Sequence, residues 1–194
     1  SANTLSLHHS LVSNYVMRGP QFEANDANNN QGYHVYMEAV NNVLFDYERS
    51  GSRYTTGIET NPSAASKIDF RFHFRKNLYL RNPNASPRSE IHAELKHGVS
   101  SRVKLHVAGN IGPNRPTDSG SEWKLVWTDN DNANSVITSA SSSVKAQMSN
   151  GPLFTTPVPV SEQSAQDAYN AIMQHVGSSL VRDAVDIRVL KNVK

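Results

Sequence analysis

Apolar and polar residues alternate over several short stretches of this chain, which is the pattern of β-strands with one buried face. The first stretch lies within residues 4–22, where Leu5 and Leu7 fall on one face, and Pro20 excludes a helix at its end. The clearest stretch spans residues 68–80 and places four apolar residues at every second position: Ile68, Phe70, Phe72 and Phe74. The pattern predicts short strands over most of the first half of the chain.

A small polar residue followed by an aliphatic one closes each of these strand-rich stretches. The four copies are Ser10-Leu11, Asn42-Val43, Asn77-Leu78 and Asn110-Ile111, and successive copies are 32, 35 and 33 residues apart. A fixed period of this length in a strand-rich chain is typical of a solenoid. Asparagines at equivalent positions of stacked layers can form a ladder of side-chain amides. The repeat therefore predicts an all-β parallel β-helix with an asparagine ladder.

Beyond the fourth copy the repeat is lost, which divides the chain into two expected regions. We expect residues 1–112 to form the coils of the β-helix and residues 113–194 to form a C-terminal extension that packs on it or caps it. One helix is predicted in the extension, beginning at a Ser164 cap and ending at Gly177. Residues 182–190 are predicted to form a charged turn and a short strand.

The first residues lead into a strand with no polar cap before it. A terminal repeat needs such a cap, because each repeat buries one face against its neighbour. We therefore expect this chain to be the C-terminal portion of a longer β-helix, with the N-terminal part of the same β-helix as its partner.

Composition excludes several classes of function. The chain has 194 residues, a net charge of +2 and 19% charged residues, so no nucleic acid or membrane partner is expected. No segment approaches the ~20 apolar residues of a membrane-spanning helix. The absence of cysteine excludes disulfides and thiolate metal sites.

Five segments of the chain resemble bacterial pectate lyases of polysaccharide lyase family 1. Two of them are specific: LSLHHSLVSNYVMRGPQF resembles the His-His-Asn-Leu strand that runs to an Arg-x-Pro turn, and SAQDAYNAIMQHVGSSLVRDAVDIRVL resembles the C-terminal tail. The other three resemble successive coils of that family: YHVYMEAVNNVLFDY, KNLYLRNPNAS and VAGNIGPN. The resemblance covers nearly the whole chain and represents the C-terminal portion of such an enzyme.

This resemblance implies a right-handed parallel β-helix that is secreted, or periplasmic, and cleaves polygalacturonate or a related acidic polysaccharide by calcium-dependent β-elimination. The arginine that removes the C5 proton corresponds to Arg18, whereas the second arginine of the family's pattern is replaced by Glu23. The calcium carboxylates and a substrate-binding lysine are expected on upstream coils, so no metal ligand is expected in this chain. Without the resemblance, Arg18 would be interpreted as a surface cation paired with Glu23.

Four further residues are candidates for substrate binding. Arg49 and Arg53 flank a Ser-Gly-Ser segment in an expected long loop, and their guanidinium groups suit uronate carboxylates, although a solvated loop explains them as well. Arg71 lies on the polar face of a strand and either extends the cleft or is an ordinary surface charge. His8 is expected to shape the site, while His9 is interpreted as a buried, hydrogen-bonded residue.

Other clusters of polar residues favour structural roles. Residues 129–131 resemble half of a calcium loop but lack its glycine and closing glutamate. Asp183, Asp186 and Arg188 are interpreted as salt-bridge partners that hold the terminal segment. Two functional alternatives stay open: a lyase that acts on another uronate polymer, and a non-catalytic β-helix that binds polysaccharide, such as a tailspike-like adhesin.

Overall fold

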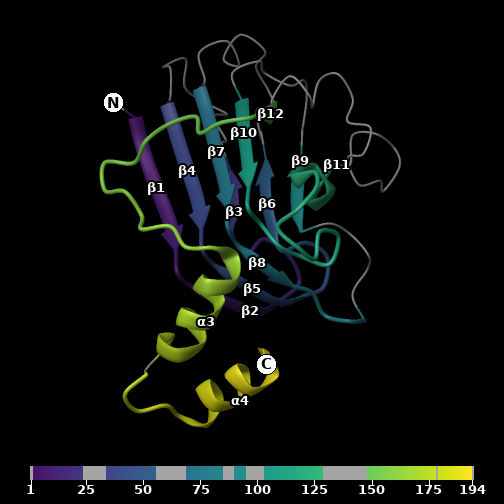
Figure 1. Ribbon diagram of the computed structural model, residues 1–194, viewed down its shortest axis with the longest axis vertical. Coiled ribbons are helices and arrows are strands. Elements are labelled where there is room, and N and C mark those ends of the chain that lie inside the picture. Colours follow the sequence, from purple (N-terminus) through teal and green to yellow (C-terminus); the bar gives the residue numbers. More distant parts are fainter. Residues whose placement is uncertain are drawn as a thin grey trace.

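The computed structural model describes residues 2–23, 34–55, 69–84, 90–94, 103–128, 148–177 and 179–193. Its strands form three parallel sheets (Figure 1). The five-stranded sheet has the order β1 (Ala2–His8), β4 (His34–Val40), β7 (Asp69–Arg75), β10 (Val103–Ala108) and β12 (Met148–Ser149). The four-stranded sheet has the order β11 (Val126–Thr128), β9 (Ile91–Glu94), β6 (Ser52–Thr55) and β3 (Gln21–Glu23). The three-stranded sheet has the order β2 (Leu11–Tyr15), β5 (Val43–Tyr47) and β8 (Leu78–Leu80).

Strands that follow one another along the chain belong to different sheets. The chain passes from β1 to β2 to β3 and returns to the first sheet with β4, which pairs in parallel with β1 from Ala2 opposite His34 to His8 opposite Val40. The predicted period thus corresponds to one strand in each of the three sheets.

The predicted fold class, an all-β right-handed parallel β-helix of the pectate lyase type with one C-terminal helix, is wrong. Within the described residues the three sheets are separate and do not join into one closed sheet. Two α-helices follow them, α3 (Ala165–His175) and α4 (Ala184–Val193), and the short 3-10 helix η1 (Glu122–Leu125) lies between β10 and β11. The arrangement is a small α/β fold of parallel sheets and helices.

The second helix replaces the strand predicted over residues 182–190. Asp183 caps α4, since its Oδ1 accepts hydrogen bonds from the backbone N–H groups of Val185 at 2.8 Å and Asp186 at 2.9 Å. Leu190 and Val193, three positions apart, form the buried face of the helix. The prediction failed because the polar-apolar alternation of residues 186–189 fits a strand as well as a short helix.

The first helix and the asparagine ladder were predicted correctly. Ser164 caps α3, because its Oγ accepts the backbone N–H of Asp167 at 3.1 Å. The amide Nδ2 of Asn42 donates to Oδ1 of Asn77 at 3.0 Å, and that of Asn77 donates to Oδ1 of Asn110 at 2.9 Å. Ser10 lies at the end of the ladder, where its backbone N–H donates to Oδ1 of Asn42 at 3.1 Å.

The core lies between the sheets and is rich in aromatic side chains. Phe22 stacks on Phe72 and Phe74 at centroid distances of 6.1 and 5.3 Å, and Tyr54 lies 5.3 Å from Phe72. Burying a side chain of this size contributes about 1.5–3 kcal/mol. The core thus ties the four-stranded sheet, which carries Phe22 and Tyr54, to β7 of the five-stranded sheet.

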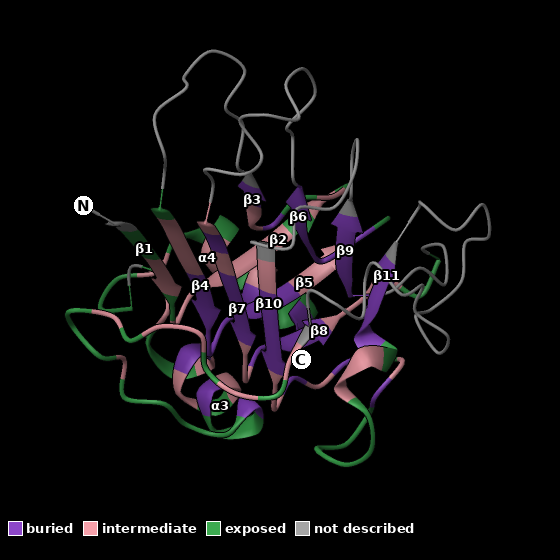
Figure 2. Ribbon diagram, turned by 90° about the horizontal axis from the view of Figure 1, so that it is seen from above, coloured by how far each residue is buried: buried purple, intermediate pink, exposed green. Residues whose placement is uncertain are grey.

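The two helices cover the outer face of the three-stranded sheet. Val43 of β5 packs with Ile172 of α3 and Val193 of α4. Figure 2 shows the buried side of α3 facing the sheets and its exposed side facing away from them. The predicted extension also contributes to the sheets, since β11 pairs with β9 and β12 pairs with β10.

Replacing Asn77 with alanine should destabilise the fold much more than replacing Ser10. Asn77 is buried, its Nδ2 donates to Ala39 O at 2.9 Å, and its Oδ1 accepts the backbone N–H of Asn42 at 2.9 Å. Losing these bonds leaves buried groups unsatisfied, so we expect Asn77→Ala to lower the free energy of unfolding by about 3 kcal/mol. Ser10→Ala, at the partly exposed end of the ladder, should lower it by less than about 1 kcal/mol. Urea denaturation measures both, and equal losses would contradict a stabilising ladder.

Candidate functional site

Arg18 lies in the turn between β2 and β3, with its side chain exposed. Its backbone φ is +74°, in the left-handed region that costs an L-residue about 1–2 kcal/mol. The following Gly19–Pro20 peptide bond is cis. The segment is therefore non-helical, as the sequence predicted, and it holds Arg18 at the surface in an unusual backbone conformation.

Hydrogen bonds fasten this turn to the turn between β5 and β6. The backbone N–H of Gly19 donates to Gly51 O at 2.9 Å, that of Arg49 donates to Val16 O at 2.8 Å, and that of Arg53 donates to Pro20 O at 3.0 Å. The Arg18 and Arg49 turns therefore lie side by side as successive layers.

Tyr15 packs beneath the Arg18 turn. Its hydroxyl donates to Gly51 O at 3.0 Å and lies 3.4 Å from Gly19 O. A Cβ atom at Gly19 would lie 2.6 Å from Tyr15 Cζ, so only glycine fits between this ring and the turn. Burial raises the pKa of Tyr15 well above its usual value, and Tyr15 therefore stays a neutral hydrogen-bond donor.

The buried residue Glu90 forms hydrogen bonds that hold the neighbouring turn between β5 and β6. Glu90 O accepts the backbone N–H of Ser52 at 2.8 Å. The Glu90 carboxyl group accepts the backbone N–H of Asn114 at 2.9 Å and its Nδ2 at 3.0 Å. Burial raises the pKa of Glu90 more than these hydrogen bonds lower it. Glu90 thus links the β5–β6 turn to the 112–115 turn.

The structure brings three of the predicted arginines together. Arg49 is exposed in the turn next to Arg18, whereas Arg53 lies in β6 and is only 7% exposed. The expectation of one long loop over residues 48–66 is wrong, because Ser52–Thr55 form a strand; the remainder of that range lies outside the described residues. Arg53 pairs in register with Gln21 and His92 of the adjacent strands.

An aromatic pair continues this row across the four-stranded sheet. The rings of His92 and Trp127 stack at 3.7 Å with an interplanar angle of 9°. The sequence contained a signal for this pair, because their spacing of 35 positions matches the repeat period. His92 and Trp127 are 8% and 5% exposed, so little of either side chain reaches solvent.

The structure places His8 and Arg71 on the five-stranded sheet, away from Arg53 of the four-stranded sheet and from the turns that carry Arg18 and Arg49. His8 is exposed at the end of β1, and its Nδ1 lies 3.2 Å from Nδ1 of His9. His9 is half-buried rather than buried. Arg71, on β7, lies 5.0 Å over the ring of Tyr36 and pairs with Asp69 at 2.9 Å. The roles of His8 and Arg71 in substrate binding stay predictions.

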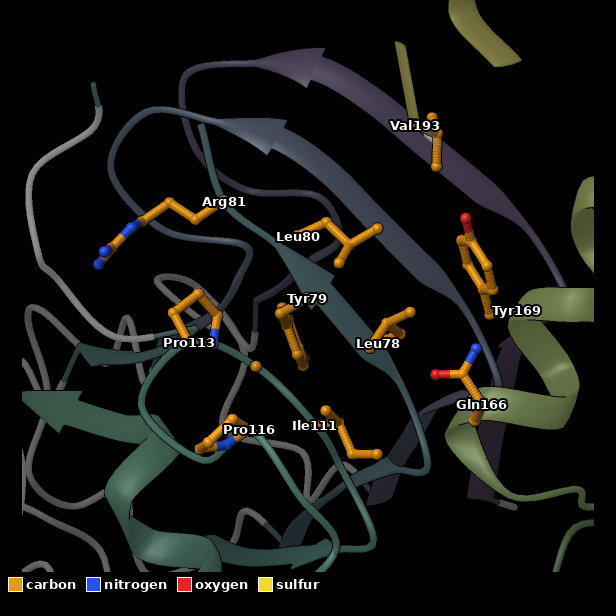
Figure 3. A pocket seen from close by; sticks show the side chains of 11 residues that line it. Leu78, Tyr79, Leu80, Arg81, Ile111, Pro113, Pro116, Gln166, Tyr169 and Val193 are labelled. Atoms are coloured by element: carbon orange, nitrogen blue, oxygen red, sulfur yellow. The ribbon is translucent and has the colours of Figure 1, made fainter. Parts of the chain in front are cut away.

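A pocket of about 500 Å³ lies beside β8, at a different place from the arginine turns (Figure 3). Its walls are largely apolar, with Tyr79 and Leu80 on the sheet, Pro113 and Pro116 on one side, and Tyr169 of α3 on the other. The figure shows the polar groups of Arg81 and Gln166 at opposite sides of the pocket. None of the residues predicted from the sequence as a site lines this pocket.

The described ranges contain no group of three histidine, cysteine, aspartate or glutamate side chains placed to hold a metal ion. The predicted half calcium loop at residues 129–131 lies outside those ranges. No helix among the residues searched is long and apolar enough to cross a membrane.

Comparisons with known proteins found no match: no family model fits the chain, and neither a curated protein nor a solved structure matches it. The resemblance to pectate lyases rests on the quoted segments alone.

The hydroxyl group of Tyr15 should contribute measurably to stability, whereas that of Tyr47 should not. The two rings lie 6.1 Å apart, but the buried hydroxyl of Tyr47 has no hydrogen-bond partner in the described part of the chain. We expect Tyr15→Phe to lower the free energy of unfolding by about 1–2 kcal/mol, and Tyr47→Phe to leave it nearly unchanged. Thermal or urea unfolding of the two variants measures the difference, and a costlier Tyr47→Phe would refute the assigned role of Tyr15.

Proposed function

We propose that this chain carries part of the active site of a pectate lyase, a calcium-dependent enzyme that cleaves polygalacturonate by β-elimination. The observation that supports the proposal best is the exposed Arg18, held in a left-handed turn that is fastened to the turn bearing Arg49. Two guanidinium-bearing side chains on adjacent layers suit a polymer with one carboxylate on each sugar.

In this proposal Arg18 takes the proton from C5 of a uronate residue. The electron pair of the C5–H bond forms the C4–C5 double bond, the bond from C4 to the glycosidic oxygen breaks, and that oxygen takes a proton from solvent. Negative charge builds on the neighbouring carboxylate as the proton leaves, and nearby cations stabilise it. Because an arginine side chain is normally protonated at neutral pH and only its deprotonated form can accept a proton, the reaction should be favoured at alkaline pH.

The two other arginines near Arg18 differ in how much of each side chain a substrate could contact. Arg49 is exposed and suits direct contact with a uronate carboxylate, whereas Arg53 is nearly buried and suits a role in shaping the surface beneath it. Calcium, when bound, would supply positive charge beside the uronate carboxylate and so stabilise the charge that develops as the C5 proton leaves. In this proposal its ligands would come from a part of the site outside this chain.

In this proposal, the part of the site that holds calcium would lie along one end of the three sheets. β1, β2 and β3 are the edge strands of their sheets at this end. Leu5 of β1 is 53% exposed, although Phe72 and Leu105 in the same row of the sheet are 0% and 1% exposed. Exposed strand edges and apolar surface favour pairing with further strands. We assign this edge to the N-terminal part of the same protein, which would supply the calcium carboxylates and the lysine.

In this proposal the protein is secreted, because polygalacturonate is too large to enter a cell intact. Another uronate polymer is the nearest alternative substrate, since Glu23 replaces an arginine of the family's pattern. Binding without cleavage is the other alternative, and it is distinguished by the absence of product.

Replacing Arg18 with lysine should abolish turnover while leaving polymer binding largely intact. Lysine keeps the positive charge but loses the planar guanidinium group, so we expect kcat to fall roughly 100- to 10,000-fold with little change in KM. The measurement is the absorbance of unsaturated uronate at alkaline pH, with calcium and with chelator, in the protein that includes its N-terminal part. Arg188→Lys, on the exposed face of α4, is the matched control and should keep the parent rate.

Three outcomes distinguish the proposed lyase from its two alternatives. Parent-level turnover in Arg18→Lys would rule out Arg18 as the base. Product from another uronate polymer, but not from polygalacturonate, would change the substrate. Retained binding with no product from any uronate polymer would favour the non-catalytic alternative.

A further inference from the structure

The segment from residue 150 to residue 164, here called the strap, joins β12 to α3 and runs across the outward face of the five-stranded sheet (Figure 1). It is anchored at two places. At its C-terminal end, Asn41 Nδ2 donates to Gln163 O at 2.9 Å, and the backbone N–H of Gln163 donates to Asn41 Oδ1 at 2.9 Å. Glu162 beside this anchor pairs with Lys76 at 3.0 Å.

The second anchor lies in the middle of the strap and depends on side chains of β7. The backbone N–H of Leu153 donates to Nε2 of His73 at 2.9 Å, and Arg71 Nη1 donates to Leu153 O at 2.7 Å. The ring of Phe154 stacks on His73 at 4.0 Å and on Tyr36 at 5.1 Å. Both backbone polar groups of Leu153 are thus bound to the sheet.

The hydrogen bond from Leu153 determines the protonation of His73. A backbone N–H can only donate, so Nε2 of His73 carries a lone pair, and the neutral ring has its proton on Nδ1. A second proton on Nε2 would place two donors against each other. The anchor therefore exists only while His73 is neutral.

His106, the neighbouring histidine on β10, behaves in the opposite way. Its Nδ1 lies 3.2 Å from Ser149 O, and since a carbonyl oxygen only accepts, this nitrogen carries a proton. Protonating the other ring nitrogen of His106 leaves that hydrogen bond in place. The two rings lie 5.4 Å apart, so His106 offers a matched comparison for His73 in the same surroundings.

Charged groups from each neighbouring strand act on His73. Nδ1 of His73 lies 3.9 Å from Glu38 Oε2, and Glu38 is also bound to Ser6 Oγ at 2.8 Å and to Arg75 at 2.7 Å. Burial lowers the pKa of His73, which has a fully buried side chain, and Arg75 and His106 lower it further, although Glu38 opposes them. Burial acts to raise the pKa of Glu38, but its hydrogen bonds outweigh this effect, so Glu38 stays ionised.

The direction of the pH effect follows from these shifts. A histidine released to water regains a pKa of about 6.5, above its value in the closed anchor, so the released state binds protons more readily. The anchor is therefore fully stable above about pH 6.5 and weakens as the pH falls below that value.

We propose that His73 is a proton-sensitive latch: protonation of its Nε2 releases Leu153 and Phe154 from the sheet while the Asn41–Gln163 anchor keeps the end of the strap bound. Release uncovers the face on which Tyr36 and Arg71 lie. The latch involves neither Arg18 nor its turn, but it does involve Arg71, a predicted substrate-binding residue, so its test follows the protection of Leu153 and not lyase activity.

Amide hydrogen exchange on the intact chain, followed by NMR from about pH 7.5 to about pH 5, tests the latch. The protection factor of the Leu153 amide, corrected for the pH dependence of intrinsic exchange, should fall about tenfold per pH unit as the pH drops below about 6.5, the pKa of the released histidine, until the anchor is open. The protection factor of Gln163 should stay constant. Ring ¹⁵N shifts should show His73 with an unprotonated Nε2 at the higher pH.

Two variants make the test specific. His73→Gln keeps an acceptor for Leu153 but does not titrate, so the pH dependence of Leu153 protection should disappear. His106→Gln should keep it.

A Leu153 protection factor that is constant while the His73 ring titrates would overturn the proposal, as would a protonated Nε2 at the higher pH. If His73→Gln does not fold, the ring shifts and Leu153 exchange of the unsubstituted chain decide the question by themselves.

Discussion

The ladder of Asn42, Asn77 and Asn110 is the interaction on which the rest of this structure depends. Asn42 and Asn77 each lie between a strand of the five-stranded sheet and one of the three-stranded sheet, and Asn110 lies between β10 and Ile111, which forms an isolated bridge with Leu78 of β8. The side-chain oxygen of each rung accepts a backbone N–H of the preceding layer. A one-residue slip would leave these buried groups unsatisfied, at a cost of about 1–3 kcal/mol for each group. The ladder therefore sets the register in which strands of successive layers pair.

That register also places the arginines. Leu11 pairs with Val43 and Tyr15 pairs with Tyr47, so the turn that follows β2 lies directly on the turn that follows β5. Arg18 and Arg49 are brought together by this stacking, although neither belongs to the core. The proposed chemistry thus depends on a buried polar ladder through the positions of two exposed turns.

The charged side chains on the outward face of the five-stranded sheet are paired with one another. On the five-stranded sheet, Arg71 pairs with Asp69, and Arg75 pairs with Glu38 and Glu162, while the strap lies over them. Arg71 is therefore bound to the strap, whereas Arg18 and Arg49 lie in exposed turns, and the role of Arg71 in substrate binding stays a prediction. The proposed latch at His73 would let this strap-covered face respond to protons without involving the Arg18 turn.

Local sequence patterns determined much of this protein by themselves. Strict alternation identified β7, a serine cap and an apolar face identified α3, and nearly equal spacing identified the ladder, because each signal arises from residues close in sequence or from a regular repeat. The tertiary structure decided what the patterns left open. It placed the strands in three separate sheets, made a helix of residues 184–193 because Leu190 and Val193 find an apolar surface to cover, and separated Arg53 from Arg71. These outcomes depend on contacts between residues far apart in the chain, and such contacts leave no local pattern.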